Sequence, residues 1–179
     1  LVEYDKNSYM QAKSLFKKYA QNKFRIINKD LFKYKTKKKF DFVVSNGVAH
    51  HTSDIIKNIN LAIKFLKKGG FLILGLGETN GFFQRNLQRY ILYSLTSDTS
   101  ELTQLSKLLF KENLLRAKKY GGRSIKEIVY DTYINPKIQT LTFQDVQNLF
   151  KKNKLYFYSA DEDDLDLKKY MDLINPILD

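Results

Sequence analysis

Two acidic residues and a glycine-containing loop are the parts of this chain best suited to hold a ligand. Glu3, Asp30 and Gly47 each follow a short apolar run. A carboxylate at the end of a parallel strand can accept hydrogen bonds from both hydroxyls of a ribose, and Asp30 can accept one from an adenine amino group. Each also has an ordinary role open to it, Glu3 at a surface turn and Asp30 in a turn or cap. Their positions after successive runs favour a ligand with an adenosine part.

The two histidines of the chain, His50 and His51, follow the loop at Gly47. Side chains of adjacent residues cannot both face one point, so at most one of them reaches a substrate. The alternative is a ring that donates to a nearby carbonyl. No cysteine is present, and no nearby residues complete a metal-ligand set around the two rings. The sequence therefore predicts no metal site.

A glycine-rich stretch at residues 75–81 resembles a dinucleotide-binding fingerprint, with Asp98 at a plausible later distance. Its third glycine falls one residue late, and no apolar strand of a βαβ unit follows it. We therefore reject this interpretation. The sequence also contains no nucleophile elbow, phosphate loop or kinase-like signature.

The elements that must position these residues are strands and helices in alternation. Four apolar runs are expected to be strands, at residues 1–3, 24–27, 41–45 and 71–74. The last is continuous, as in strands that are covered on both faces. This order predicts an α/β fold with a Rossmann-like, mostly parallel sheet and helices on both faces. A ligand is then expected beyond the carboxyl ends of the strands.

Two helices lie between these strands. Ser8 is expected to cap the first helix, which ends near Ala20. Thr52 or Ser53 is expected to cap the second, and the Lys-Lys-Gly-Gly sequence at residues 67–70 is expected to end it, because glycine can adopt the left-handed conformation there.

From residue 81 to about residue 135 the pattern changes to helices with polar breaks. Three apolar stripes are expected to face inward: Phe82, Phe83, Leu87, Tyr90 and Ile91; Leu102, Leu105, Leu108 and Leu109; and Ile125, Ile128 and Val129. An insertion beyond the carboxyl end of a strand would overhang the ligand site. We therefore expect a partial Rossmann-like core (residues 1–80), a helical lid insertion (residues 81–135), and a C-terminal helix and strand that return to the core (residues 136–179).

In the C-terminal part, Thr142 is expected to cap the helix and residues 155–158 to form a last strand. The acidic run at residues 161–164 lacks the glycine and the spaced ligands of a calcium loop, so a solvated loop is expected there.

The charge of the chain is strongly basic, with 31 Lys+Arg against 19 Asp+Glu in 179 residues and a net charge of +12. Of the basic residues, 26 are Lys, whereas Arg is preferred for contacts with bases and phosphates. We interpret the charge as a solvated surface that needs no polyanion. No run approaches the roughly 18 apolar residues of a membrane helix, and the first residues lack a signal pattern, so a cytoplasmic protein without membrane contact is expected.

Residues 40–52, Phe-Asp-Phe-Val-Val-Ser-Asn-Gly-Val-Ala-His-His-Thr, resemble the fourth-strand motif of class I S-adenosylmethionine-dependent methyltransferases. Residues 66–74 resemble the end of that family's next helix and its fifth strand. Residues 2–8 and 28–31 are similar to the end of its second strand and to the segment beside the adenine. Residues 122–143 are similar to a lid and tail found in a bacterial subgroup of uncertain substrate.

The resemblance implies methyl transfer from S-adenosylmethionine to a nucleophile on a small-molecule acceptor. The implied cofactor-binding residues are Glu3 for the ribose with Tyr4 beside it, Asp30 and Leu31 for the adenine, and Asn46, Gly47 and Val48 for the methionine side. His50 or His51 is the candidate to orient or deprotonate the acceptor.

Two alternatives stay open beside this function. One is an RNA acceptor, bound by arginines and a lysine run: Arg85, Arg89, Arg116, Lys35, Lys37, Lys38 and Lys39. The other is a non-catalytic scaffold domain related to the enzymes. The oligomeric state is not predicted.

The sequence departs from the family at its start, because the family's first strand and glycine-rich loop precede the position of Glu3. In the family that strand lies at the centre of the sheet, between the strands that end here at Glu3 and at Ser45. The resemblance therefore predicts a ladder broken between those two strands, in a chain that is part of a longer enzyme and lacks the main backbone cradle of the cofactor.

Overall fold

The computed structural model describes residues 1–19 and 23–158, which divide into two compact units between Thr142 and Phe143. The elements up to the fourth strand are β1 (Val2–Glu3), α1 (Lys6–Tyr19), β2 (Ile27–Asn28), the 3-10 helix η1 (Leu31–Lys33), β3 (Phe40–Asn46), the 3-10 helix η2 (Ala49–His51), α2 (Ile55–Phe65) and β4 (Leu66–Gly75). The later elements are α3 (Phe83–Leu95), α4 (Thr99–Leu109), α5 (Lys111–Gly121), α6 (Ile125–Val129), the π-helix η3 (Tyr130–Ile134) and α7 (Phe143–Lys152). The α/β class predicted from the sequence is confirmed.

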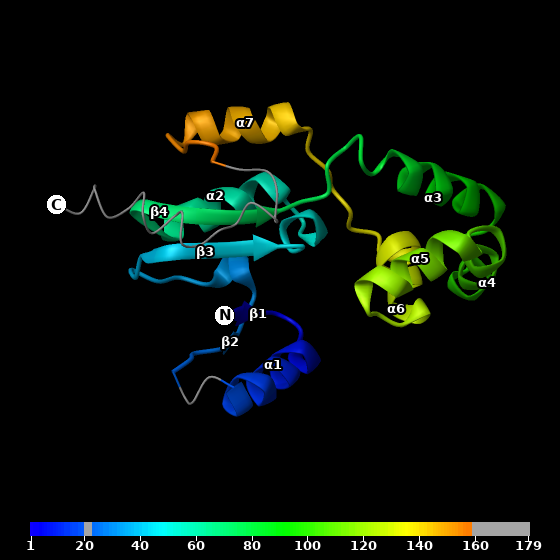
Figure 1. The fold of residues 1–179 in the computed structure, drawn as a ribbon, viewed down its shortest axis with the longest axis horizontal. Helices are drawn as coiled ribbons and strands as arrows, with labels where there is room; N and C mark the ends of the chain where they lie inside the picture. Colours follow the sequence, from blue (N-terminus) through cyan, green and yellow to red (C-terminus); the bar gives the residue numbers. More distant parts are fainter. Residues whose placement is uncertain (20–22, 159–179) are drawn as a thin grey trace. The chain divides into compact units, whose positions relative to one another are not determined.

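The strands form two separate parallel pairs, β1 with β2 and β3 with β4. In the first pair Glu3 lies opposite Asn28, and in the second Asn46 lies opposite Gly75. Figure 1 shows β3 and β4 side by side with their arrowheads at the same end. Within residues 1–19 and 23–158 no ladder joins β1 to β3, which confirms the predicted break between the strands that end at Glu3 and at Ser45.

Helix α2 packs against the β3·β4 pair through its apolar face. Ile55, Ile59 and Ala62 lie on that face at helical spacing and are buried. Burying each of the two isoleucine side chains stabilises the packing by about 1.5–3 kcal/mol. This packing fixes the position of η2, which directly precedes the helix.

The two predicted N-caps in this region were wrong. The N–H of Ser8 donates to the Asp5 carboxylate at 2.7 Å, so Asp5 closes the start of α1. At α2 the cap is Asp54, which accepts from the N–H of Lys57 at 2.8 Å, rather than Thr52 or Ser53. In both cases an aspartate close to the predicted hydroxyl residue is the N-cap. Its negative charge also interacts favourably with the positive N-terminal end of the helix dipole.

The predicted end of the second helix was also wrong, because α2 stops at Phe65 and β4 begins at Leu66. The left-handed glycine is present: Gly69 has φ +77°. It lies inside an irregularity of β4, where the partner shifts from Leu66 opposite Phe40 to Phe71 opposite Phe42. Glycine is used here for a bulge and not for a helix cap.

The strand predicted at residues 24–27 lies further along the chain, at Ile27–Asn28. A ladder needs a partner, and β1 offers only Val2 and Glu3. Phe24 instead packs its ring against Phe16 of α1, with the ring centroids 5.4 Å apart.

The last predicted strand is absent, because residues 155–158 have no strand assignment. The run at residues 71–74 is a strand, but these residues are only half-buried and not covered on both faces as expected. Helix α7 begins directly after Thr142, as predicted. Ala20 and the acidic run at residues 161–164 lie outside the described residues.

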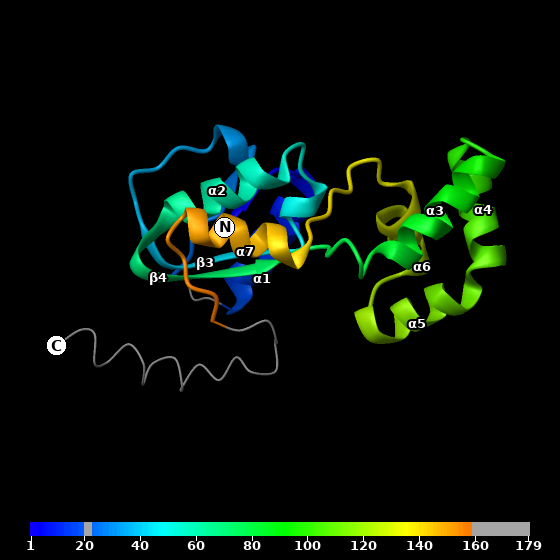
Figure 2. The same ribbon diagram turned by 90° about the horizontal axis from the view of Figure 1, so that it is seen from above.

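The helices between residues 83 and 134 contain the main hydrophobic cluster of the chain, and Figure 2 shows them packed on one another. The cluster consists of Leu92, Leu102, Leu114, Ile128, Val129 and Tyr133. The first predicted stripe was wrong: Phe83, Leu87 and Tyr90 are exposed, and α3 buries Gln88 and Leu92 instead. Gln88 is buried because its amide oxygen accepts from the Tyr133 hydroxyl at 2.9 Å. In the part of the chain described, no helix is both long and apolar enough to cross a membrane.

Candidate functional site

Glu3 and Asp30 lie at the same edge, beyond the β1·β2 pair. The Asn28 side chain ties the two strand ends together, donating to the backbone oxygens of Glu3 and Tyr4 at 2.9 and 3.0 Å. The N–H of Lys29 donates to the Glu3 oxygen at 2.9 Å. The parallel register therefore places the two acidic residues at the same edge of the strand pair.

Each of the two carboxylates already caps a local turn with one oxygen. Glu3 Oε1 accepts from the N–H of Asp5 at 2.9 Å, and Asp30 Oδ1 accepts from the N–H of Phe32 at 2.9 Å. These are the ordinary turn and cap roles that the sequence left open. A carboxylate has two oxygens, each with two lone pairs, so both residues keep acceptor capacity. Tyr4 is exposed beside them.

Asn46 is the last residue of β3, and Gly47 and Val48 begin the loop after it. Gly47 has φ +69°, a conformation that favours glycine, and its N–H donates to the Gly75 oxygen at 3.1 Å. The Asn46 side chain lies over Gly75, where an added Cβ would come within 1.9 Å of its Oδ1 atom. Space beside Gly47 is open, because no atom lies within 4 Å of a Cβ built there.

His50 lies just after this loop and is buried, with 8% of its surface exposed. Its Nδ1 atom has no hydrogen-bond partner among the described residues. Burial lowers the pKa of His50, and the charges of His51 and Arg85 lower it further, while Asp131 raises it. The ring is therefore held in the neutral form, in which one nitrogen can accept a proton.

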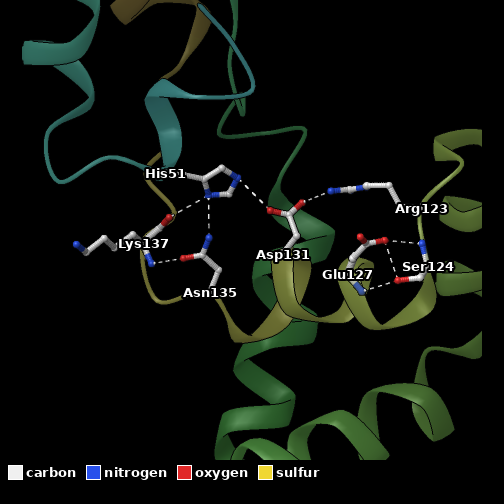
Figure 3. Close-up of polar contacts among 7 residues, drawn as sticks. All are labelled: His51, Arg123, Ser124, Glu127, Asp131, Asn135 and Lys137. Carbon is white, nitrogen blue, oxygen red and sulfur yellow. Dashed lines mark hydrogen bonds and ion pairs between the residues drawn. The ribbon is translucent and has the colours of Figure 1, made fainter. Parts of the chain in front are cut away.

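His51 has partners at both ring nitrogens, as Figure 3 shows. Nε2 lies 3.1 Å from Asp131 Oδ1, and since a carboxylate can only accept, Nε2 carries the hydrogen. Nδ1 lies 3.2 Å from Asn135 Nδ2, which donates to it in the neutral ring, and 3.2 Å from the Lys137 oxygen. Both nitrogens of His51 therefore contact the segment that follows α6.

Asp131 is itself held in place by Arg123, whose guanidinium lies 3.1 Å from Oδ2. Arg123 directly precedes the start of α6, where Ser124 and Glu127 form a reciprocal capping box (Figure 3). The hydrogen bonds from Ser124 lower the pKa of Glu127. The geometry at Asp131 therefore depends on how α6 begins.

Gln139 joins the segment after η3 to the start of α2. Its N–H donates to the His50 oxygen at 2.9 Å, and its side-chain oxygen accepts from the N–H of Ile55 at 2.8 Å. Its amide nitrogen donates to the Ser53 oxygen at 3.2 Å. His51 and Gln139 thus bind residues 131–139 to the loop that follows β3.

Arg85, in the first turn of α3, lies against the same loop. Its guanidinium carbon is 4.2 Å from the centre of the Phe82 ring, and that ring contacts His50 edge-on with centroids 6.1 Å apart. The Phe82 ring packs onto Gly77, where an added Cβ would meet it at 2.6 Å. Burial lowers the pKa of Arg85, although a guanidinium stays charged.

The residues predicted from the sequence fall into two groups. One group lies at the end of the β1·β2 pair and just beyond it: Glu3, Tyr4, Asp30 and Leu31. The other lies at the end of β3 and just beyond it: Asn46, Gly47, Val48, His50 and His51. No hydrogen bond among residues 1–19 and 23–158 joins one group to the other. The 3-10 helix after Asp30 contacts α2, where Lys57 lies over the Phe32 ring at 5.2 Å.

A groove of about 460 Å³ lies between that 3-10 helix and α2. Its lining residues are Phe32, Asp54, Ile56, Lys57, Asn60, Leu61 and Lys64. The described residues contain no cluster of three or more His, Asp or Glu side chains that could hold a metal ion.

Phe82 and Arg85 were not predicted as neighbours of His50, and Gln139 was not predicted as a contact of the loop. No local signal identifies these residues, because each acts through a contact with a distant part of the chain. The capping box at Ser124 and Glu127 did have a signal, the Ser-x-x-Glu spacing before an apolar run.

Comparison with known sequences gives one family match. Residues 1–74 match the family model described as methyltransferase domain. The match runs from β1 through nearly all of β4 and includes every predicted cofactor-binding residue. No curated protein sequence matches the chain significantly.

Comparison with solved structures finds the same fold. The structure of PKMT2 from Rickettsia typhi has a TM-score of 0.63 at 17% identity, over 85% of this chain and 32% of that one. The structure of PKMT2 in complex with AdoHcy has a TM-score of 0.61 at 20% identity, over the same shares. This chain therefore spans about a third of the length of the proteins whose fold it shares.

Proposed function

We propose that this chain, whose first 74 residues belong to the methyltransferase domain family, transfers a methyl group from S-adenosylmethionine to a small-molecule acceptor. The observation that carries the proposal is the pair of acidic strand ends, Glu3 and Asp30, held at one edge by Asn28. The AdoHcy complex of PKMT2, a protein with the same fold, supports the choice of cofactor.

The residues present fit an adenosyl cofactor. Glu3 and Asp30 keep acceptor capacity for the ribose hydroxyls and the adenine amino group, since each uses one oxygen locally. Leu31 and Tyr4 lie directly beside them in the chain. Gly47 leaves open space next to its backbone, and Asn46 and Val48 flank it. We assign the methionine side of the cofactor to this loop.

When bound, the cofactor would supply an activated methyl group on a sulfonium, for in-line transfer to the acceptor's nucleophile with the thioether AdoHcy as leaving group. The chain has to align the two molecules and exclude water. His50, whose ring burial keeps neutral, is suited to take the acceptor's proton. We assign His51 a positioning role, because both of its nitrogens are engaged. The helices of residues 81–135 act as a lid in this proposal.

Two arginines form contacts within the chain, which favours a small-molecule acceptor over RNA. Arg89 donates to the backbone oxygens of Thr132 and Tyr133 at 3.3 and 2.8 Å, so it supports the π-helix. Arg123 is paired with Asp131. These two guanidinium groups are therefore not available to a phosphate backbone.

The test is calorimetric titration of the full-length protein with AdoHcy. Glu3→Gln removes the charge that strengthens bonds to the ribose hydroxyls, and such bonds contribute about 1.5–3 kcal/mol, so we expect AdoHcy affinity to fall by at least tenfold. Glu112→Gln, on the exposed first turn of α5, is the matched control and leaves affinity unchanged. An affinity of the Glu3 variant within twofold of the parent would refute the ribose assignment.

A further inference from the structure

A cluster of positive charge surrounds Asp131. Arg123 and His51 contact its two oxygens directly, and Arg85 interacts with it electrostatically. The charges of Arg89 and Arg123 act against that of Arg85. The Asp131 carboxylate therefore interacts with two guanidinium groups and an imidazole, Arg89 adds a third guanidinium near Arg85, and the cluster has an excess of positive charge.

The three arginines of this cluster differ in whether their guanidinium groups have hydrogen-bond acceptors. Arg123 has Asp131, and Arg89 has two backbone oxygens. Arg85 is half-buried, and within the described residues its guanidinium makes no hydrogen bond or ion pair. A partly desolvated guanidinium offers five donors and lacks an acceptor here. Glu78, the acidic residue nearest to Arg85 in sequence, accepts hydrogen bonds from the N–H of Gly81 and the side-chain amide of Asn80 within its own turn.

The surroundings of Arg85 also suit a negative group. Helix α3 begins with Phe82 as its N-cap, which provides no side-chain acceptor, and its first turn contains no acidic residue. No acidic side chain of the first turn therefore compensates the positive end of this 13-residue helix, and the Glu78 carboxylate before it accepts from the N–H of Gly81. Phe82 also contacts His50, which is 8% exposed and has an unpartnered Nδ1. The unpaired cation thus lies next to the residue that we assign to the acceptor.

We infer that Arg85, with the first turn of α3, forms an anion subsite that binds a carboxylate or phosphate group of the methyl acceptor. This inference rests on the proposed function and specifies its substrate class, an anionic small molecule whose nucleophile lies near His50. Phe82 supports the guanidinium from its ring face, and the planar fork of Arg85 suits bidentate binding of an oxyanion.

The test is a ³¹P NMR titration of inorganic phosphate with the full-length protein, in which binding broadens the phosphate line. Acetate is added as a competitor. We expect saturable broadening that acetate reverses, and at least tenfold weaker phosphate binding in Arg85→Gln. Arg85→Lys keeps the positive charge without the planar guanidinium, so its phosphate affinity is expected to lie between those of the parent and of Arg85→Gln. Arg116→Gln, an exposed arginine of α5, is the matched control and is expected to bind phosphate as the parent does.

The same titration at saturating AdoHcy separates the two sources of a carboxylate. If phosphate still binds, the subsite serves the acceptor, as we infer. If AdoHcy abolishes phosphate binding, the anion belongs to the cofactor's own carboxylate and the acceptor assignment is overturned. Equal phosphate binding by the parent and Arg85→Gln, or no saturable binding, also overturns it. AdoHcy affinity is measured on every variant, so that loss of the cofactor site, which would refute the proposed function, is distinguishable from loss of the anion subsite.

Discussion

His50 and His51 are adjacent in the chain but differ in what surrounds each ring. His50 is buried and its Nδ1 has no partner among the described residues, whereas His51 is bound at both nitrogens. Adjacency predicted that only one of them reaches a substrate, and the surroundings favour His50. The sequence could not make that choice, because the partners of His51 lie at least 80 residues away.

The lowered pKa of His50 has a consequence for stability. Above a pH of about 6.5 the residue is neutral in both the folded and unfolded protein. As the pH falls below that value, the unfolded chain takes up a proton first, so the folded state loses stability until the pH passes the lower, folded-state pKa. The charge state of His50 therefore penalises folding in mildly acidic solution.

His50→Gln removes this linkage, because glutamine stays neutral. We expect the free energy of unfolding in urea to fall less between pH 7.5 and pH 5.5 in the variant than in the parent. Other groups titrate equally in both proteins and cancel in the comparison. An identical pH dependence of the two proteins would contradict a burial-lowered pKa at His50.

At the scale of elements, the helix starts show how local electrostatics decides between neighbouring residues. Asp54 and Asp98 cap α2 and α4 by accepting backbone N–H groups of the first turn. The hydroxyl residues before Asp54 do other work: Thr52 donates to the Ala49 oxygen at 2.7 Å. The sequence placed helix α2 correctly and its cap one or two residues early, because Ser, Thr and Asp are similarly good caps.

Replacing the cap of α2 tests this assignment. Asp54→Ala is expected to cost about 1 kcal/mol of unfolding free energy, because the N–H of Lys57 loses its acceptor. Ser53→Ala, one residue earlier and also exposed, is the matched control and should stay within about 0.5 kcal/mol of the parent. Urea unfolding measures both, and a larger loss in the Ser53 variant would restore the original cap prediction.

At the scale of the first unit, Leu1–Thr142, the loop after β3 is held by contacts from residues far along the chain. His51 pairs with Asp131, and Gln139 binds the backbone at His50, Ser53 and Ile55. The N–H of Thr79 also donates to the Leu141 oxygen at 3.1 Å. The segment after the helical insertion therefore helps to set the shape of the candidate site.

A double-mutant cycle on His51→Gln and Asp131→Asn measures this link. Both side chains are about three-quarters buried, so we expect a coupling of about 0.5–1 kcal/mol in urea unfolding. The control cycle is Lys67→Gln with Asp41→Asn, an exposed pair at 2.9 Å whose coupling is expected to be below about 0.5 kcal/mol. A coupling at His51 no larger than that of the control would mean that the contact does not hold the loop.

The periodicity of apolar residues was enough to locate most strands and helices and the acidic residues at the strand ends, and the family resemblance predicted the break between the strand pairs. These features depend on neighbours in the chain and, for the break, on a resemblance over residues 2–74. Periodicity failed for α3, where an apolar stripe is exposed and Gln88 is buried by its bond to Tyr133. Only the path of the chain decided that pairing, and likewise the contacts of His51 with Asp131, of Gln139 with His50, and of Phe82 with His50. A polar or aromatic side chain finds its partner wherever folding brings a complementary group within reach, and the spacing of residues along the chain does not encode that distance.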